Sequence, residues 1–239
     1  MKIMLGIPTY DGSIDMEFHL SVVNTITHFK DIQFRHCVYK NTWVASARNN
    51  IVEQFLNDPE LTHLLLLDDD ICWNLEDISE LLKYGQELDV VGGLYPKKEI
   101  DYNTIEQTLQ QGVPKEKLNE FTGLIDNGMF DPVEKNPDLT KPVGVVKLAT
   151  GFTLIKKEIF TKIKENFPEN SYRRNGKDLF LYFDTQLEKH EDGVRYYYGN
   201  DTYFCYLWRQ LGGKVYLLPW VNPSHIGKFK YERKIFNKL

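Results

Sequence analysis

The chain has 239 residues, enough for one large domain or two small ones with a hydrophobic core. Its 42% hydrophobic and 26% charged residues are typical of a soluble globular protein, and its formal net charge of −5 argues against a general affinity for nucleic acid or anionic membrane. Three widely spaced cysteines, the lack of a signal-peptide pattern and the lack of any apolar run of membrane-spanning length make the cytoplasm the expected location.

Strands and helices alternate through the first hundred residues. Apolar runs predict strands at 3–7, 32–39, 63–67 and 88–95. Apolar spacing and end signals predict helices at 13–29, 46–58 and 74–85, with Phe18, Val22, Ile26 and Phe29 on one face of the first. This alternation predicts an α/β fold with a mostly parallel central sheet and helices on both faces.

The pattern loosens over 100–142, a polar, proline-containing stretch in which we expect at most two short helices, at 103–111 and 115–121. This composition indicates an insertion, either at the edge of the sheet or over a functional site. Order returns over 143–227, where strands flank a loop-rich segment and a helix at 201–211, and a basic tail follows at 228–239. We therefore expect a single domain, 1–239, with these four parts: 1–99, 100–142, 143–227 and 228–239.

The sequence THLLLLDDDICW, at 62–73, runs an apolar strand directly into three aspartates. In open α/β sheets, ligands bind beyond the carboxyl ends of the strands. If the strand stays extended, Asp68 and Asp70 point to one side and Asp69 points to the other. Two carboxylates on one side favour a bound cation, and a hard divalent ion held together with substrate phosphates fits. The alternative is a solvated acidic turn that caps the next helix.

At this point the chain resembles the GT-A fold glycosyltransferases. LLLLDDDI resembles their DXD motif, IPTYDG their nucleotide-binding opening, YYGNDTYFCYLWRQLGGKVYLLP their ED-type motif and NPSHIG their C-terminal histidine motif. The four matches occur in the family's order and cover about 1–99 and 143–227. The chain is similar to the short family-2-like enzymes of bacteria and phages. One departure is Asn200, which stands where the ED motif usually has its first acid.

The resemblance implies a fold, a reaction and its partners. The fold is GT-A, with a nucleotide-binding half at 1–99 and an acceptor half at 143–227. The reaction moves a sugar from a nucleotide-diphospho-sugar, with UDP favoured, to the hydroxyl of a glycan or another acceptor. Mn²⁺ or Mg²⁺ would hold the diphosphate. The resemblance does not identify the sugar or the acceptor.

The resemblance also assigns metal ligands. Asp70 would bind the ion directly, and Asp68 would bind it through water or contact the ribose. His225 would bring a neutral imidazole to the same ion from the far end of the chain. A lone histidine is more often structural, but His225 follows a strand and a proline within the matching motif.

Asp201 is the expected general base. A sugar hydroxyl is a poor nucleophile, so an enzyme that inverts the anomeric centre needs a base opposite the leaving nucleotide. Asp201 also opens a helix, where it can act simply as an N-cap. A retaining enzyme of the same fold would not need this base, so both stereochemical outcomes stay open.

Further residues are expected around the donor. Nucleotide contacts are assigned to Pro8, Thr9, Tyr10, Asp11, Arg48, Asp68 and Asp69. Arg48 is also consistent with a solvated charge, although helix N-termini in this fold neighbour phosphates. Contacts with the donor sugar or the acceptor are assigned to Gly151, Asn200 and Trp73. The alternative for Gly151 is a simple strand bulge.

Two other functions remain open from the sequence. Phosphohydrolases also place a DxD after an apolar strand, but their first aspartate normally follows an early strand and His225 would have no role. A non-catalytic nucleotide- or glycan-binding module is the other, and Asn200 favours it. The basic tail at 228–239 could fold over the diphosphate as a lid or be solvated.

Overall fold

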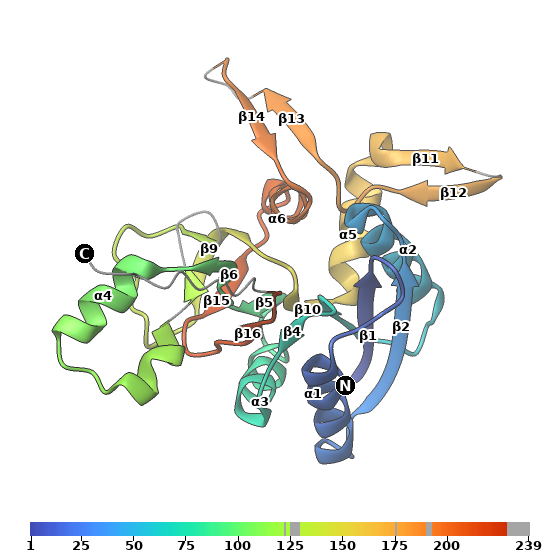
Figure 1. Cartoon of the computed structure of the whole chain (residues 1–239). Coiled ribbons are helices and arrows are strands. Elements are labelled where there is room, and N and C mark those ends of the chain that lie inside the picture. Colours follow the sequence, from blue (N-terminus) through green and yellow to red (C-terminus); the bar gives the residue numbers. More distant parts are fainter. Residues whose placement is uncertain (122, 125–129, 175, 190–192, 229–239) are drawn as a thin grey trace.

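A computed structural model describes residues 1–239 except 122, 125–129, 175, 190–192 and 229–239. Most of the basic tail therefore lies outside the described residues. The main sheet has eight strands in the order β2-β1-β3-β10-β5-β15-β9-β8. Their bounds are β1 Lys2–Thr9, β2 Gln33–Lys40, β3 His63–Leu67, β5 Val90–Gly93, β8 Phe130–Pro132, β9 Val143–Leu148, β10 Phe152–Lys156 and β15 Val215–Leu218. Only β10 and β9 run against the other six, so the expected mostly parallel sheet is confirmed (Figure 1).

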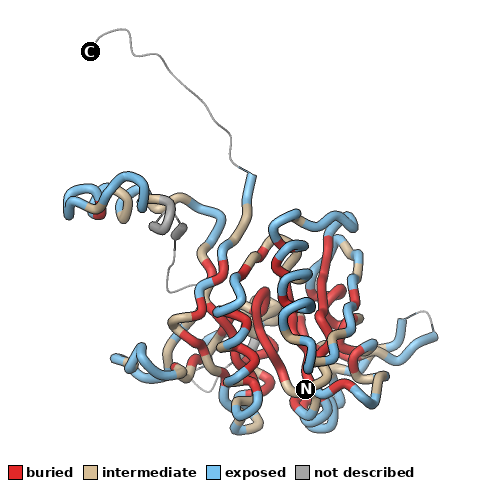
Figure 2. Tube along the Cα trace, turned by 90° about the horizontal axis from the view of Figure 1, so that it is seen from below, coloured by how far each residue is buried: buried red, intermediate tan, exposed pale blue. Residues whose placement is uncertain are grey.

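The helices cover both faces of this sheet, as predicted. They are α1 Met16–His28, α2 Val44–Asn57, α3 Leu75–Tyr84, α4 Tyr102–Gln110, α5 Lys157–Asn166 and α6 Asn200–Gln210, with 3₁₀ turns at Lys115–Phe121 and Pro168–Asn170. The core on one face is built with α2, α5 and α6, and the core on the other with α1 and α3. Figure 2 shows the buried strands between exposed outer surfaces. None of the helices in the described ranges is long and apolar enough to cross a membrane.

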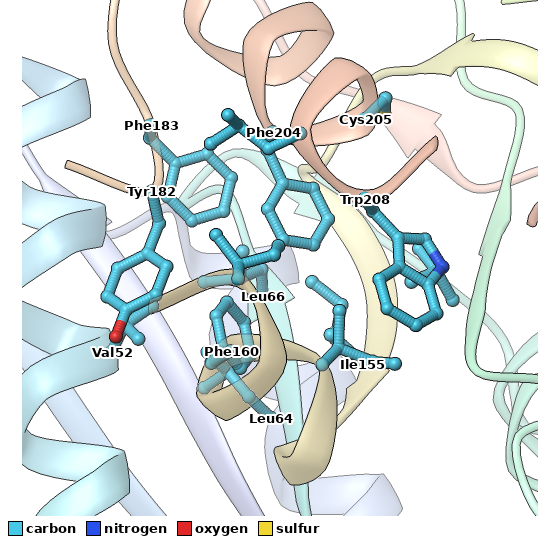
Figure 3. Close-up of a cluster of buried hydrophobic side chains, with 14 of the residues drawn as sticks. Val52, Leu64, Leu66, Ile155, Phe160, Tyr182, Phe183, Phe204, Cys205 and Trp208 are labelled. Atoms are coloured by element: carbon cyan, nitrogen blue, oxygen red, sulfur yellow. The ribbon is translucent and has the colours of Figure 1, made fainter. Parts of the chain in front are cut away.

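Strand β3 explains the run of four leucines. It lies between β1 and β10, and all four leucines are fully buried. Successive side chains of a strand point to opposite faces, so Leu64 and Leu66 enter the core with α2, α5 and α6, whereas Leu65 and Leu67 enter the other core. Figure 3 shows Leu64 and Leu66 within a cluster that includes Phe160 of α5. An apolar sequence on both faces is what a central strand requires.

Helix α1 follows the expected pattern at three of the four predicted residues. Phe18 is buried, but Ile26 is 37% exposed, and the buried face continues through Ser21 and Thr25. The reason is Trp73, whose indole N–H donates to the Thr25 hydroxyl at 2.9 Å, while the Ser21 hydroxyl donates to the Trp73 carbonyl at 3.0 Å. These bonds add polar contacts beside Phe18, while Val22 and Phe29 also pack against the core.

Two regions that the sequence left loose contain short strands. The segment 100–142 contributes α4, the 3₁₀ turn at Lys115–Phe121, and β8, which extends the edge of the main sheet at β9. In place of one strand amid loop, 171–199 forms two hairpins, whose strands are β11 Ser171–Arg174, β12 Lys177–Phe180, β13 Gln186–Lys189 and β14 Arg195–Tyr198. Both hairpins project from the body of the molecule (Figure 1).

Candidate functional site

The three aspartates form a turn at the carboxyl end of β3. The Ile71 N–H donates to the Asp68 carbonyl at 3.1 Å, so the chain bends and the extended conformation does not persist. The condition for Asp68 and Asp70 to share one side is thus not met. The turn is fixed by its neighbours, since the carbonyl of Asp69 accepts the N–H of Asp15 at 3.0 Å and the N–H of Asp68 donates to Gly151 at 2.9 Å.

A short ladder brings His225 to Asp70 from the far end of the chain. Strand β4, Ile71–Cys72, pairs antiparallel with β16, Ser224–His225, and the Ile226 N–H donates to the Asp70 carbonyl at 2.8 Å. As a result, the His225 Nε2 lies 3.3 Å from an Asp70 carboxylate oxygen.

The imidazole of His225 is oriented by the backbone. Its Nδ1 lies 2.8 Å from the Pro96 carbonyl, which can only accept, so Nδ1 carries the proton and donates. In the neutral ring, Nε2 then presents a lone pair toward the Asp70 carboxylate. Two acceptors at this separation need a proton or a cation between them.

Asp70 is also held by Lys98, whose ammonium bonds to its other carboxylate oxygen. Burial opposes ionisation of Asp70, but the contacts with His225, when its ring is protonated, and with Lys98 outweigh it and hold the pKa of this carboxyl below its ordinary value. Burial has the opposite result at Asp69, where it raises the pKa of the carboxyl, with a further contribution from the two adjacent aspartates. The three aspartates therefore have different environments.

Arg48, one turn into α2, lies at the centre of a second cluster. Its side chain is 3% exposed. One terminal nitrogen donates to an Asp68 carboxylate oxygen at 2.7 Å, and the other bonds to Asp201 and to the Asn200 amide oxygen. Burial favours the neutral form, but Asp201 and Asp68 outweigh it, so the pKa of the Arg48 guanidinium is raised and the group is fully charged.

Asp201, at the start of α6, receives two bonds on the same oxygen. Its Oδ1 accepts from Arg48 and from the hydroxyl of the buried Thr150. The cap of α6 is Gly199, without a side-chain bond, so the plain reading of Asp201 as the N-cap is wrong.

Gly151 has a tightly filled environment. A Cβ at this position would lie 2.4 Å from the Asp68 Oδ2 and 2.5 Å from the Tyr95 hydroxyl, closer than atoms can approach. The Gly151 N–H donates to the Tyr95 hydroxyl at 3.0 Å, and the Tyr95 ring packs edge-on against His225. Burial raises the pKa of Tyr95 well above its ordinary value, so the phenol keeps its proton. Glycine is thus needed here to admit the Asp68 carboxylate.

These side chains surround one pocket of about 320 Å³ at the carboxyl ends of β1 and β3. Its lining residues are Pro8, Thr9, Tyr10, Asn41, Thr42, Val44, Arg48, Asp68, Asp69, Asp70, Asn200, Asp201 and His225. Ten of these were named from the sequence as site residues.

Three residues named from the sequence do not line this pocket. Asp11 bonds to the N–H of Ser13 at 2.8 Å on the exposed surface. Gly151 lies behind Asp68. Trp73 is 8% exposed and packs between Phe18 and Phe152 in the core, so the structure does not support its assignment to the donor sugar or the acceptor.

The sequence reasoning missed Tyr95 and Thr150. Both follow strands of the main sheet, since Tyr95 comes two residues after β5 and Thr150 comes two residues after β9. For Tyr95, the rule that functional groups collect beyond the carboxyl ends of parallel strands was a usable signal. Thr150 follows an antiparallel strand, so that rule gave no indication of it.

Two of the three predicted metal ligands are arranged so that they could hold a divalent ion, and the third is not. Within the described part of the chain, no three His, Cys, Asp or Glu side chains form a group that could hold a metal. The expected set of Asp68, Asp70 and His225 is therefore not assembled, because Asp68 turns toward Arg48. Asp70 and His225 alone face each other as two ligands, with the second ring nitrogen held by a carbonyl as in metal-bound histidines. Two protein ligands suffice where substrate phosphates supply the others.

Comparisons with known proteins show what fold the chain resembles but do not assign it to a family. No family model and no curated protein matches the sequence. Among solved structures, A197 from STIV is similar with a TM-score of 0.52 and 18% identity, over 95% of this chain and 87% of A197. GalNAc-T7, crystallised with UDP, GalNAc and Mn²⁺, has a TM-score of 0.48 and 12% identity, over 96% of this chain and 44% of GalNAc-T7. At such low identity, the likeness to A197 shows a shared fold alone.

Proposed function

We propose that this protein is a metal-dependent glycosyltransferase that moves a sugar from a nucleotide-diphospho-sugar, with UDP favoured, to a hydroxyl acceptor. One observation carries the proposal. Asp68–Asp70, Asp201 and His225 come from three distant parts of the chain, yet all of them line one pocket at the carboxyl end of the sheet. A turn of solvated carboxylates would need neither Asp201 nor His225.

The donor side is assigned to 1–99 together with His225. Pro8, Thr9 and Tyr10 line the pocket beside the aspartates, and Tyr10 is 69% exposed, which leaves its ring available to stack on a nucleobase. Asp70 and His225 would hold Mn²⁺ or Mg²⁺ against the diphosphate. When bound, such an ion offsets the charge that develops on the leaving nucleotide.

The acceptor side is assigned to 143–227. Asp201 is 30% exposed at the pocket, and the bonds from Arg48 and Thr150 both fall on Oδ1. Oδ2 is then the oxygen that would take the proton of the acceptor hydroxyl. A base in this position favours inversion of the anomeric centre.

The test uses purified protein with a panel of nucleotide-sugars, Mn²⁺ or Mg²⁺, and glycan or other hydroxyl acceptors. The expected result is a glycosylated product whose anomeric configuration, measured by NMR, is opposite to that of the donor. Retention would remove Asp201 as the base and leave a retaining transferase. Nucleotide binding without transfer or donor hydrolysis would instead identify a binding module.

Phosphate release from simple esters without any nucleotide would identify a phosphohydrolase. The geometry disfavours that alternative, because Arg48 bonds to Asp68, the aspartate that would have to act as the nucleophile.

A further inference from the structure

The guanidinium of Arg48 bonds mainly to oxygen atoms of the protein itself, although it lines the pocket. Both terminal nitrogens are bonded, one to Asp68 and the other to Asp201 and Asn200. Its Nε is buried and has no hydrogen-bond partner among the described residues, and the guanidinium carbon lies 5.9 Å from the centre of the Phe183 ring. A phosphate would have to reach a side chain that is 3% exposed and would compete there with two carboxylates.

The two carboxylates held by Arg48 belong to opposite sides of the pocket. Asp68 ends β3 in the half assigned to the donor, and Asp201 begins α6 in the half assigned to the acceptor. The planar guanidinium fixes directions as well as distances, because its nitrogens form a rigid fork. One cation therefore sets where these two carboxylates lie relative to each other.

We propose that Arg48 is a positioning residue. It holds the carboxylate of the base Asp201 at a fixed position relative to Asp68 and makes no contact with the nucleotide. This inference rests on the proposed function. Thr150 supplies a second bond to the same Asp201 oxygen, and Asn200 gives Arg48 a third oxygen without adding a third negative charge. The Asn200 amide thus leaves the buried cation facing two carboxylates.

The first test is Arg48→Lys, which keeps a buried positive charge but loses the fork. Because a misplacement of about 1 Å can cost ~10²-fold in rate, we expect the kcat for transfer to fall about 10²-fold. UDP affinity, measured by calorimetry with Mn²⁺, should change by less than about threefold, since Arg48 does not touch the nucleotide. A loss of UDP affinity as large as the loss of kcat would overturn the proposal in favour of a phosphate contact.

The second test separates positioning from a general structural role. Residues that act through one another give strongly non-additive losses. In an Asp201→Asn background, Arg48→Lys should lower kcat at least tenfold less than it does in the wild-type chain. Equal losses in the two backgrounds would mean that Arg48 does not act through Asp201.

Arg35 offers a matched control. It also bridges two carboxylates, Asp58 and Glu60, but on the surface before β3 begins. Arg35→Lys should leave both kcat and UDP affinity unchanged, and a comparable loss of kcat would show that the effect is not specific to Arg48.

If Arg48→Lys does not fold, Asn200→Ala provides another variant. It withdraws one of the two oxygens that hold the Arg48 nitrogen facing Asp201, so kcat should fall while UDP affinity is kept; an unchanged kcat would count against the proposal. A wild-type chain that neither binds UDP nor transfers sugar would overturn the proposed function and this inference with it. Wild-type activity with additive losses would overturn this inference alone.

Discussion

Two arginines lie at opposite ends of the same sheet, and each bridges two carboxylates. Arg35 meets Asp58 and Glu60 just before β3 begins, and its side chain is 48% exposed. Arg48 meets Asp68 and Asp201 just after β3 ends, and its side chain is 3% exposed. The arginine of the bridge is therefore solvated at one end of the sheet and buried at the other, whereas Asp68 and Asp201 remain 28% and 30% exposed.

The comparison shows at which end of the sheet the loss of an ion pair should cost more stability. An exposed ion pair contributes little, because water and salt screen it. A buried one carries a desolvation cost, and removal of one partner leaves an uncompensated charge. The amino end of the sheet can lose its bridge at little cost, whereas the carboxyl end cannot, and the pocket lies at the carboxyl end.

The largest expected effect is on catalysis at the buried end. Asp201→Asn keeps the shape and the oxygen that accepts from Arg48 and Thr150 but cannot take a proton. Transfer should fall by about 10²–10⁴, the usual contribution of a positioned general base, while UDP and metal still bind. Steady-state kinetics with Asp58→Asn as the control would check this. Near wild-type turnover by Asp201→Asn would exclude it as the base.

Removal of the buried cation should give the largest loss of stability. Arg48→Met leaves Asp68 and Asp201 without their shared partner, so we expect the free energy of unfolding to fall by about 3–5 kcal/mol, as for other broken buried pairs. Urea unfolding of the metal-free protein measures it. A loss below about 1 kcal/mol would mean that water solvates these carboxylates after all.

Gly151→Ala sharpens the comparison without changing a charge. The new methyl group would overlap the Asp68 carboxylate and the Tyr95 hydroxyl, so a loss of about 1–3 kcal/mol is expected, as for other overpacked sites. Gly144 in β9 is the matched control, because a Cβ there meets no atom within 4 Å. Equal unfolding midpoints for the two alanine variants would contradict the packing seen around Asp68.

The smallest effect should come from the exposed bridge. Arg35→Met should cost only about 0.2–1 kcal/mol, and the loss should shrink as salt is added. Urea unfolding at low and high ionic strength tests both points. A salt-independent loss of several kcal/mol would show that exposure does not separate the two arginines.

Local sequence patterns were enough to predict the fold but only part of the candidate site. Four consecutive leucines predicted a strand buried on both faces, and the alternation of strands and helices predicted the mostly parallel sheet; both are confirmed. The helix at 46–58 also keeps Ala47, Ile51 and Phe55 buried, as their spacing indicated.

The sequence could not reveal partners that only tertiary structure brings together. It assigned Arg48 to the nucleotide but could not show that this side chain bonds to Asp201, which lies on a distant helix. It left Trp73 as a candidate sugar platform because the hydroxyl of Thr25, which fixes the indole, is on α1. The sequence also could not show to which side Asp68 points, because the turn at 68–70 depends on Gly151 and on the pairing of β16 with β4.

Calorimetry of UDP binding, with and without Mn²⁺, tests the central claim most directly. Asp68, Asp69, Asp70 and Asp201 line the pocket, and Arg48 and Lys98 offset two of these four charges, so the remaining carboxylates would repel a diphosphate unless a further cation lies between them. We predict measurable UDP binding with Mn²⁺, its loss after EDTA, and a folded protein in both cases by circular dichroism. Equal UDP affinity with Mn²⁺ and with EDTA would contradict a metal-dependent nucleotide site.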